Sequence, residues 1–358
     1  MPPRFTMPVP SFPSISAARA ESIHRIAGIL RTAGTVAVTT HINADGDACG
    51  SVSAMARLLP QLGPKAIIVN PTPWPALFGF LREGLVDRSA EGAAALTGVD
   101  CLVALDVSDI RRLGQLSAAA RTLEVPRVVI DHHVPTEEPA GEILLADTAA
   151  CATGELMFDF AVELGLEIDL AIADALYAAI LTDTGGWRYS NTSPRSHRIA
   201  AALIELGVDP EGMYRGIYAS LSLGRLSLLR EALDSLGVDS EYGLAWVSIT
   251  NEALDRHGVS SDDLDGIVEH PRSIAGTRVA LFFRDLGYGK VKVSFRSTGD
   301  VDVNRLARRF GGGGHEKAAG ALIPGSLSDV QTRVVSAARE HMGPVRTASN
   351  GRSLEGDQ

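Results

Sequence analysis

Short apolar runs alternate with helical stretches over the first half of the chain. The runs that read as strands are 35–40, 65–69, 101–105 and 127–130. They are rich in Val, Ile and Leu and apolar almost throughout, which is typical of strands buried on both faces of a parallel sheet. Ala- and Leu-rich stretches such as 50–62 and 171–182 separate or follow these runs and predict helices. The alternation predicts a doubly wound α/β fold.

The pattern changes twice in the second half of the chain. Residues 194–236 have helical spacing throughout and predict a connection between two domains. Beyond Tyr242, strand-like runs return at 244–249, 278–283 and 290–295. The last of them alternates apolar and polar residues, as a strand with one exposed face does. We therefore predict a smaller C-terminal α/β domain with a mixed sheet.

Two domains agree with the length of 358 residues, at about 150 residues per domain. We expect the first domain at 20–195, a helical linker at 196–238 and the second domain at 239–343. Residues 1–19 contain five prolines and no continuous apolar run, so we expect a disordered leader there. Residues 344–358 are expected to be a disordered tail.

The charge balance narrows the class of partner. Lys+Arg 33 against Asp+Glu 43 gives a formal net charge of −10, whereas proteins that coat duplex DNA or RNA usually have the opposite sign. No stretch approaches 18 uninterrupted apolar residues, so we expect no membrane-spanning helix. The three cysteines, Cys49, Cys101 and Cys151, are too few and scattered for a disulfide framework, which fits a cytoplasmic protein.

Acidic and histidine side chains follow the predicted strands at their carboxyl ends. They are His41, Asp45, Asp47, Asp106, Asp131, His132 and His133, with Asp183 at the end of a predicted helix. In an open α/β sheet, ligands bind outside the carboxyl ends of the strands, so these side chains are expected at one edge. Five carboxylates facing one crevice repel one another and raise each other's pKa, so the cluster needs compensating cations.

The chemistry of this set points to two hard metal ions. Carboxylate oxygens with two or three imidazoles suit Mn²⁺ or Mg²⁺, and the thiolates of a structural zinc site are missing. Two ions about 3.5–4 Å apart, bridged by a shared carboxylate, can hold a hydroxide for in-line attack on phosphorus. Asp106 is the candidate for that bridge. Each motif alone has a plain interpretation as a turn, a helix end or a loop pair, but their joint placement favours a metal centre.

Together these motifs resemble the DHH phosphoesterase family. The resemblance rests on His41-x-x-x-Asp45-x-Asp47, Asp106, Asp131-His132-His133 and Asp183-Thr184-Gly185-Gly186. The segment 311–320, GGGGHEKAAG, is similar to the glycine-rich signature of the associated second domain. The similarity extends over about residues 20–340.

The resemblance implies two Mn²⁺ ions, with Mg²⁺ or Co²⁺ as substitutes. It implies that one ion is held by His41, Asp45 and Asp106, and the other by Asp47, Asp106, His132 and Asp183. It also implies that Asp131 orients a histidine and that His133 faces the substrate phosphate. Asp106, Asp131 and His133 are accordingly the expected catalytic residues.

A basic cluster marks the second domain as the place where substrate binds. Residues 290–317 contain seven basic and three acidic residues, a local charge of +4. Arg296 ends a predicted strand just before a loop, where its guanidinium can bind a phosphate through two hydrogen bonds. The glycines Gly312, Gly313 and Gly314, followed by His315, can present backbone N–H groups to an anion. A flexible hinge after a helix is the alternative interpretation of these glycines.

The leading hypothesis is an enzyme that hydrolyses very short RNA. A small basic patch suits a substrate of a few phosphates rather than a long polymer, and the two-domain chain is similar to the nano-RNase and pAp-phosphatase group. Expected substrates are nanoRNA, dinucleotides such as pApA, and adenosine 3′,5′-bisphosphate (pAp). Two alternatives stay open: a phosphodiesterase of cyclic or linear dinucleotide second messengers, and a nucleotide-binding sensor without catalysis. Monomer and homodimer are both open.

Overall fold

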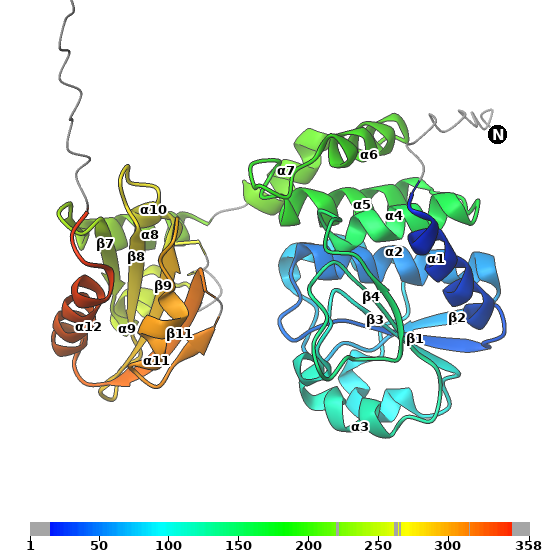
Figure 1. The fold of residues 1–358 in the computed structure, drawn as a ribbon, viewed down its shortest axis with the longest axis horizontal. Helices are drawn as coiled ribbons and strands as arrows, with labels where there is room; N and C mark the ends of the chain where they lie inside the picture. The colour runs from blue at the N-terminus through cyan, green and yellow to red at the C-terminus, as the bar shows by residue number, and fades with distance from the viewer. Residues whose placement is uncertain (1–14, 220–221, 261–263, 265, 315, 346–358) are drawn as a thin grey trace, which may run out of the picture. The chain divides into compact units, whose positions relative to one another are not determined.

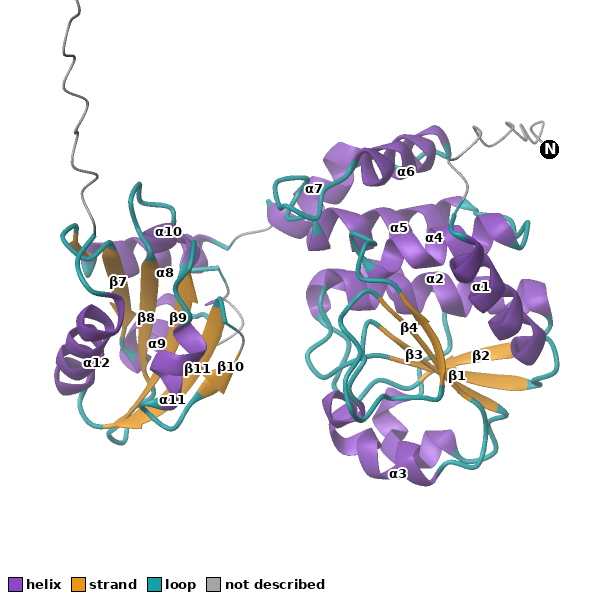
Figure 2. Cartoon of the chain, in the orientation of Figure 1, coloured by secondary structure: helices purple, strands orange, loops and turns teal. Residues whose placement is uncertain are grey.

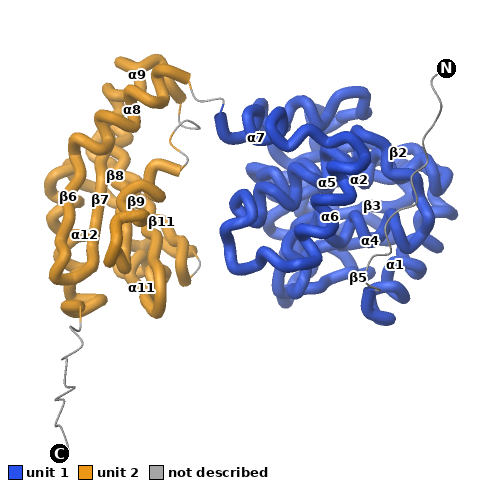
Figure 3. Tube along the Cα trace, turned by 90° about the horizontal axis from the view of Figure 1, so that it is seen from above, with its two compact units in different colours: residues 1–220 blue, residues 221–358 orange. Residues whose placement is uncertain are grey.

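The chain divides into two compact units, each with its own sheet and core. The computed structural model describes residues 15–219, 222–260, 264, 266–314 and 316–345. The N-terminal unit is Met1–Ser220 and the C-terminal unit is Leu221–Gln358 (Figure 3). Within the described ranges, no helix is both long and apolar enough to cross a membrane.

The N-terminal unit is built on a parallel five-stranded sheet. Its strands are β1 (Thr35–Thr39), β2 (Lys65–Ile68), β3 (Cys101–Leu105), β4 (Arg127–Asp131) and β5 (Ile143–Ala146). The order is β2-β1-β3-β4-β5, and every neighbouring pair is parallel. From β1 the chain crosses to β2 on one side, and β3 then pairs on the other side of β1. Such a switch point opens a crevice between the carboxyl ends of β1 and β3, where ligands bind in this class of fold.

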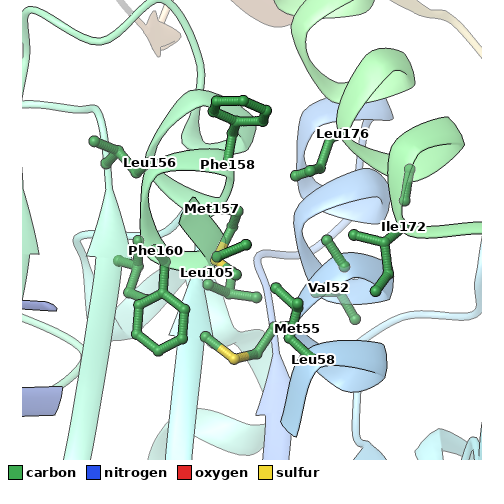
Figure 4. Close-up of a cluster of buried hydrophobic side chains, with 14 of the residues drawn as sticks. Val52, Met55, Leu58, Leu105, Leu156, Met157, Phe158, Phe160, Ile172 and Leu176 are labelled. Carbon is green, nitrogen blue, oxygen red and sulfur yellow. The ribbon is translucent and has the colours of Figure 1, made fainter. Parts of the chain in front are cut away.

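Helices cover both faces of this sheet, as Figures 1 and 2 show. One face packs against α1 (Ala17–Leu30), α2 (Gly46–Leu62), α4 (Thr153–Glu163) and α5 (Leu170–Asp183). The other packs against η2 (Ser89–Leu96), η3 (Ile110–Leu116) and α3 (Ser117–Thr122). Figure 4 shows the first of these cores, where side chains of α2, α4 and α5 meet Leu105 of β3. The predicted doubly wound α/β fold is confirmed.

The segment predicted to be helical throughout, 194–236, is three separate helices. They are α6 (Pro194–Glu205), α7 (Pro210–Tyr218) and α8 (Leu223–Asp234). α6 and α7 belong to the N-terminal unit and α8 to the C-terminal unit, so the expected linker is divided between them. The first break has a local cause: Gly207 has φ of +108°, and Asp209 caps a new helix that begins at Pro210.

The C-terminal unit has the mixed sheet that the sequence predicts. Its strands are β6 (Gly237–Asp239), β7 (Leu244–Ile249), β8 (Val279–Asp285), β9 (Lys290–Ser297), β10 (Gly313–Gly314) and β11 (Ala318–Pro324). The order is β10-β11-β9-β8-β7-β6, with β7 and β8 parallel and the other pairs antiparallel. One face packs against α11 (Val303–Arg308) and α12 (Leu327–Met342). The other packs against α8, α9 (Asn251–His257) and the segment around α10 (Glu269–Arg272).

Candidate metal centre

The loop after β1 and the start of α2 position three of the predicted ligands. α2 begins at Gly46, four residues earlier than the pattern predicts, because Asp45 is its N-cap: Asp45 Oδ1 accepts a hydrogen bond from the Ala48 N–H at 3.1 Å. Asp47 then falls in the first helical turn, where the helix dipole favours a carboxylate. Because the helix starts directly after the strand, Asp45 and Asp47 stay beside His41.

Asp106 stands at the centre of the arrangement, at the carboxyl end of β3. Its φ is +58°, in the left-handed region that a residue with a Cβ rarely adopts, which costs of the order of 1–3 kcal/mol. Its two carboxylate oxygens face different histidines: Oδ2 lies 3.4 Å from His41 Nε2, whereas Oδ1 lies 3.6 Å from His132 Nε2 and 3.5 Å from His133 Nδ1. Asp106 therefore lies beside both His41 and His132.

The remaining predicted ligands complete two groups around these histidines. In the first, His41 Nε2 lies 3.8 Å from Asp45 Oδ2. In the second, His132 Nε2 lies 3.7 Å from Asp47 Oδ2 and 3.8 Å from Asp183 Oδ2. All six side chains predicted as ligands thus come together at one edge of the sheet, although strands and helices far apart in the sequence supply them.

The two histidine nitrogens fit a metal ion. His41 Nδ1 donates to the Ile42 carbonyl oxygen at 2.8 Å, a bond that leaves the lone pair on Nε2. The Nε2 atoms of His41 and His132 are buried, and neither has a hydrogen-bond partner among the described residues. Their distances to the carboxylates are too long for hydrogen bonds. They are close to the roughly 3–3.5 Å that separates two ligand atoms when each lies about 2.0–2.2 Å from one ion.

The protonation equilibria of the cluster also favour a bound cation. Burial, together with the neighbouring carboxylates, raises the pKa of Asp47 and of Asp106. Burial also raises the pKa of Asp183. The same burial lowers the pKa of His41 and of His132, so both imidazoles stay neutral near pH 7 and can act as ligands.

Two further polar residues, Thr153 and Asn191, hold the predicted ligands in place. Asp47 accepts hydrogen bonds from the backbone N–H groups of Thr153 at 2.7 Å and Gly154 at 2.9 Å, in the first turn of α4. The Thr153 hydroxyl donates to Asp106 Oδ1 at 3.0 Å. Asn191 Nδ2 donates to Asp183 Oδ2 at 3.1 Å. A neutral side chain that donates a hydrogen bond leaves no charge or spacing signal in a sequence. The available signal for Thr153 is the Thr-Gly pair at the start of a helix.

Asp131 and His133 form a charged pair beside the two groups. Asp131 is fully buried and accepts hydrogen bonds from the Ser108 hydroxyl and from His133 Nδ1, the latter at 2.8 Å. Burial opposes ionisation, but these hydrogen bonds outweigh it and lower the pKa of Asp131. The hydrogen bond to Asp131 raises the pKa of His133 to about 9. His133 is therefore a cation near neutral pH, and its side chain is 47% exposed.

Apart from His133, the residues predicted to bind substrate belong to the C-terminal unit. Arg296 is the penultimate residue of β9, where its Nε lies 3.9 Å from Glu269 Oε1. Gly313 and Gly314 form β10, which pairs with β11, and β11 in turn pairs with β9. His315 lies outside the described residues.

The glycine segment packs more tightly than an open anion loop. The Gly312 N–H donates to the Ala307 carbonyl, and the Gly314 N–H donates to Asn304 Oδ1. Two of the three N–H groups expected to face an anion therefore have partners within the protein. A Cβ at Gly312 would lie 2.1 Å from the Gly320 carbonyl oxygen, so this glycine allows close approach to β11.

Comparisons with known proteins agree with this geometry. The model of the DHH family N-terminal domain matches residues 35–180, and that of the DHHA1 domain matches residues 245–342. The bifunctional oligoribonuclease and PAP phosphatase NrnA of Thermus thermophilus is 31% identical over 326 residues, which cover 90% of this chain and 95% of that protein.

Solved structures share the fold. The crystal structure of an exopolyphosphatase-related protein from Bacteroides fragilis matches with a TM-score of 0.83 and 25% identity, over 90% of this chain and 96% of that one. The structure of RecJ in complex with Mn²⁺ from Thermus thermophilus matches with a TM-score of 0.53 and 16% identity. That match covers 94% of this chain and 57% of the RecJ chain, and it shows the fold alone.

Proposed function

The chain belongs to the DHH phosphoesterase family, and we propose that it is a metal-dependent enzyme that hydrolyses short oligoribonucleotides to mononucleotides, pAp to AMP and phosphate, or both. The observation that carries the proposal is the pair of buried, unpartnered His41 and His132 Nε2 atoms, each facing carboxylate oxygens. The substrate class is supported by the 31% identical relative, which is named an oligoribonuclease and PAP phosphatase.

Under this proposal, His41, Asp45 and Asp106 hold one ion, and Asp47, Asp106, His132 and Asp183 hold the other. Mn²⁺ is the expected metal, because the ligands are carboxylate oxygens and imidazoles, and Mg²⁺ or Co²⁺ can substitute. Bound ions supply a Lewis acid and make water acidic enough to attack phosphorus near neutral pH. The first set is supported by the ligand atoms of His41, Asp45 and Asp106, and the second by those of Asp47, His132 and Asp183, which in each group lie within 4.8 Å of one another. Asp106 joins the second set through His132, whose Nε2 lies 3.6 Å from Asp106 Oδ1.

The chain's own residues supply the remaining steps of the mechanism. Asp131 holds His133 through Nδ1, so the protonated ring presents its Nε2–H outward from a half-exposed side chain. That proton can be donated to a non-bridging oxygen of the substrate phosphate, which becomes more negative as the nucleophile attacks. Thr153 holds Asp106 in place, and Asn191 does the same for Asp183.

A cytoplasmic setting is part of the proposal. Cys49, Cys101 and Cys151 are free and buried thiols. Burial raises the pKa of all three thiols above the ordinary value, so they are unreactive packing residues. Free cysteines are the usual state in a reducing compartment.

The substrate assignment is tested by measuring Mn²⁺-dependent release of phosphate and mononucleotides from pAp, pApA, five-nucleotide RNA and twenty-nucleotide RNA. We expect rapid hydrolysis of the short substrates and little of the longest. A panel that also contains a cyclic dinucleotide separates the alternatives: hydrolysis of the cyclic compound alone indicates a second-messenger phosphodiesterase. Binding without hydrolysis of any substrate indicates a sensor.

Mn²⁺ is expected to raise the thermal midpoint of the protein, and more at pH 7.5 than at pH 5.5. Folding raises the pKa of Asp47, Asp106 and Asp183 above the value that an unfolded chain has. The metal-free protein therefore loses stability as the pH rises from the unfolded-state pKa of these carboxyl groups through their raised folded-state pKa. Metal binding needs the deprotonated forms and so strengthens with pH. At 100 times the dissociation constant, binding contributes about 2.7 kcal/mol, or roughly 5–10 °C for a domain of this size.

Scanning calorimetry with Mn²⁺ and with a chelator at both pH values measures this effect. In the Asp106→Asn variant, Mn²⁺ should raise the thermal midpoint much less than in the unaltered protein. Asp174→Asn is the matched control, since burial also raises the pKa of Asp174, which lies on α5 and outside both ligand groups. An equal shift at the two pH values, or a full shift in Asp106→Asn, would count against metal binding by this cluster.

Replacing Arg296 with alanine is expected to lower kcat/KM only for substrates that carry a second phosphate. Losing a hydrogen bond between charged groups costs about 1.5–3 kcal/mol, so kcat/KM for pAp and pApA should fall roughly ten- to hundredfold in Arg296→Ala. We expect the same of His315→Ala. Hydrolysis of p-nitrophenyl phosphate, which has no second phosphate, should change little, and the bound metal should be retained.

The control for Arg296→Ala is Arg308→Ala, which removes an exposed arginine of α11. Equal losses on both substrate classes, or loss of metal from Arg296→Ala, would place Arg296 in the catalytic centre instead.

A further inference from the structure

A network of charged side chains lies in the N-terminal unit, outside the metal centre. It joins two arginines on different helices to three carboxylates, and its members are Arg19 of α1, Arg195 of α6, Asp147 after β5, and Glu155 and Asp159 of α4. The side chains of Glu155 and Asp159 are each 2% exposed. The proposed function gives none of these five residues a role.

Glu155 uses its two carboxylate oxygens for different partners. Oε1 lies 3.4 Å from Arg19 Nη1 and 3.3 Å from Arg195 Nε. Oε2 accepts a hydrogen bond from the backbone N–H of Cys151 at 3.1 Å. Cys151 belongs to residues 147–154, the β5–α4 segment, which leads from the end of β5 into the first turn of α4. Glu155 therefore joins the two arginines to the backbone of this segment.

Arg19 also holds the start of the β5–α4 segment. Its Nη2 donates to Asp147 Oδ2 at 2.6 Å, and Asp147 Oδ1 accepts a hydrogen bond from the Ala149 N–H at 2.9 Å. A guanidinium carries its donors in one rigid plane, so the carboxylates of Asp147 and Glu155 are held at a set spacing. Both ends of the segment are thereby fixed by one side chain of α1.

The β5–α4 segment bears directly on two carboxylates of the metal centre. Asp47 accepts hydrogen bonds from the N–H groups of Thr153 and Gly154, and the Thr153 hydroxyl donates to Asp106 Oδ1. Both carboxylates belong to the second ion, which is proposed to be held by Asp47, Asp106, His132 and Asp183.

Asn191 extends this contact to a third ligand of the second ion. Its Nδ2 donates to the Cys151 carbonyl oxygen at 2.8 Å and to Asp183 Oδ2 at 3.1 Å. The ligands proposed for the first ion alone, His41 and Asp45, instead form hydrogen bonds with the backbone of the loop after β1 and of the first turn of α2. The segment therefore supports the second ligand set rather than the first.

Stability alone does not account for so many buried charges. Taking charged groups out of water is costly, and apolar residues of similar volume often give equal or greater stability. Hydrogen bonds between charged groups add a defined geometry. In this network, Glu155 is the residue whose second oxygen binds the backbone between β5 and α4.

We infer that Glu155 is a positioning residue for the second ion. Held by the two arginines, it fixes the β5–α4 segment, whose N–H and hydroxyl groups orient Asp47 and Asp106. The inference rests on the proposed function, in which these carboxylates hold that ion. Loss of a group that orients a metal ligand typically costs about ten- to hundredfold in metal affinity, and Glu155 acts through one further residue, so we expect about tenfold.

The test measures Mn²⁺ binding without substrate. Electron paramagnetic resonance of free Mn²⁺ during a titration gives a dissociation constant for each ion. His41→Ala and His132→Ala identify the two steps, because each removes a ligand proposed for one ion only. In Glu155→Gln, the dissociation constant of the second ion should rise about tenfold, and that of the first should change less than about twofold. Glutamine keeps the shape of glutamate, but its amide has one oxygen and cannot accept hydrogen bonds on both sides.

Asp159→Asn is the matched control. Asp159 lies one turn further along α4, is as buried as Glu155 and pairs with the same two arginines through its two oxygens. Both variants should lower the thermal midpoint of the metal-free protein, but only Glu155→Gln should weaken the second ion. Asp147→Ala, at a side chain that is 29% exposed, removes the acceptor of the Ala149 N–H and should weaken the same step. It decides the question if Glu155→Gln does not fold.

Equal weakening of the second ion in Glu155→Gln and Asp159→Asn, or equal weakening of both ions, would show that the network acts through stability and would overturn the inference. Unchanged binding in folded Glu155→Gln, or a single Mn²⁺ per chain in the unaltered protein, would overturn it as well. Saturating Mn²⁺ should restore the kcat of Glu155→Gln on pAp. A protein that binds two Mn²⁺ ions but hydrolyses no substrate would overturn the proposed function, while the titration still decides the role of Glu155.

Discussion

Replacing Asp106 with alanine is expected to abolish turnover on every substrate that the intact enzyme hydrolyses. Its two oxygens face His41 at 3.4 Å and His132 at 3.6 Å, so the substitution removes a ligand from both groups at once. Under the proposed function, both ions would then be held by incomplete ligand sets, and the attacking nucleophile would depend on the two ions together. A loss of roughly a thousandfold or more in kcat is expected, because the residues of such a centre act as a unit.

The pattern across variants and substrates identifies the shared role of Asp106. His41→Ala removes a ligand from one group only and should leave more activity. Thr153→Val removes one hydrogen bond to Asp106 and should have a smaller effect. Unlike Arg296→Ala, Asp106→Ala should lose pAp and p-nitrophenyl phosphate hydrolysis equally. The measurements are steady-state rates on both substrates, bound Mn²⁺ by elemental analysis and circular dichroism of the fold. Retention of more than a few per cent of activity would remove Asp106 from the bridging position.

The residues at the carboxyl ends of the strands could be predicted because two strong signals coincide there. Runs such as 101–105 and 127–130 are apolar enough to indicate buried parallel strands, and the structure places β3 and β4 within one residue of them. Parallel strands all deliver their carboxyl ends to one edge. Asp106 and His132 therefore had to be neighbours of His41 once the strands were identified, whatever the length of the loops between them.

Other features depend on contacts that no local pattern records. Thr153 and Asn191 donate hydrogen bonds to the predicted ligands Asp106 and Asp183, and neutral donors have no periodicity or charge that a sequence pattern could reveal. The early start of α2 depends on whether Asp45 caps a helix or ends a turn, and the same residues suit both. Arg284 lies opposite Lys292 because of the register in which β8 pairs with β9. A shift of that register by one residue would place one of the two side chains on the other face of the sheet.

A single methyl group added to α2 is expected to disturb the fold and the metal centre together. α2 carries Asp45 and Asp47 at its start, and α5 carries Asp183 at its end. A Cβ at Gly50, in α2, would lie 2.3 Å from the Ala175 carbonyl oxygen and 2.8 Å from the Ala179 Cβ, both in α5. The first of these atoms belongs to the backbone, so the two helices must move apart to accept the methyl group.

We expect Gly50→Ala to lower the free energy of unfolding by about 1–3 kcal/mol, as overpacking of a well-packed core does. The control is Gly28→Ala in α1, where a Cβ meets nothing within 4 Å. There the same substitution should raise the free energy of unfolding by about 0.5–1 kcal/mol, because alanine is the better helix former. The two variants thus make the same substitution within a helix, with opposite expected signs.

Urea unfolding of both variants, with and without Mn²⁺, measures the two effects. Because Asp47 and Asp183 belong to one ligand group but to different helices, Gly50→Ala should also weaken Mn²⁺ binding, whereas Gly28→Ala should not. The gain in unfolding free energy on adding Mn²⁺ should therefore be smaller in Gly50→Ala than in the unaltered protein. If Gly50→Ala proved as stable as Gly28→Ala and bound Mn²⁺ equally well, the close contact of α2 with α5 could not be what holds Asp47 and Asp183 together.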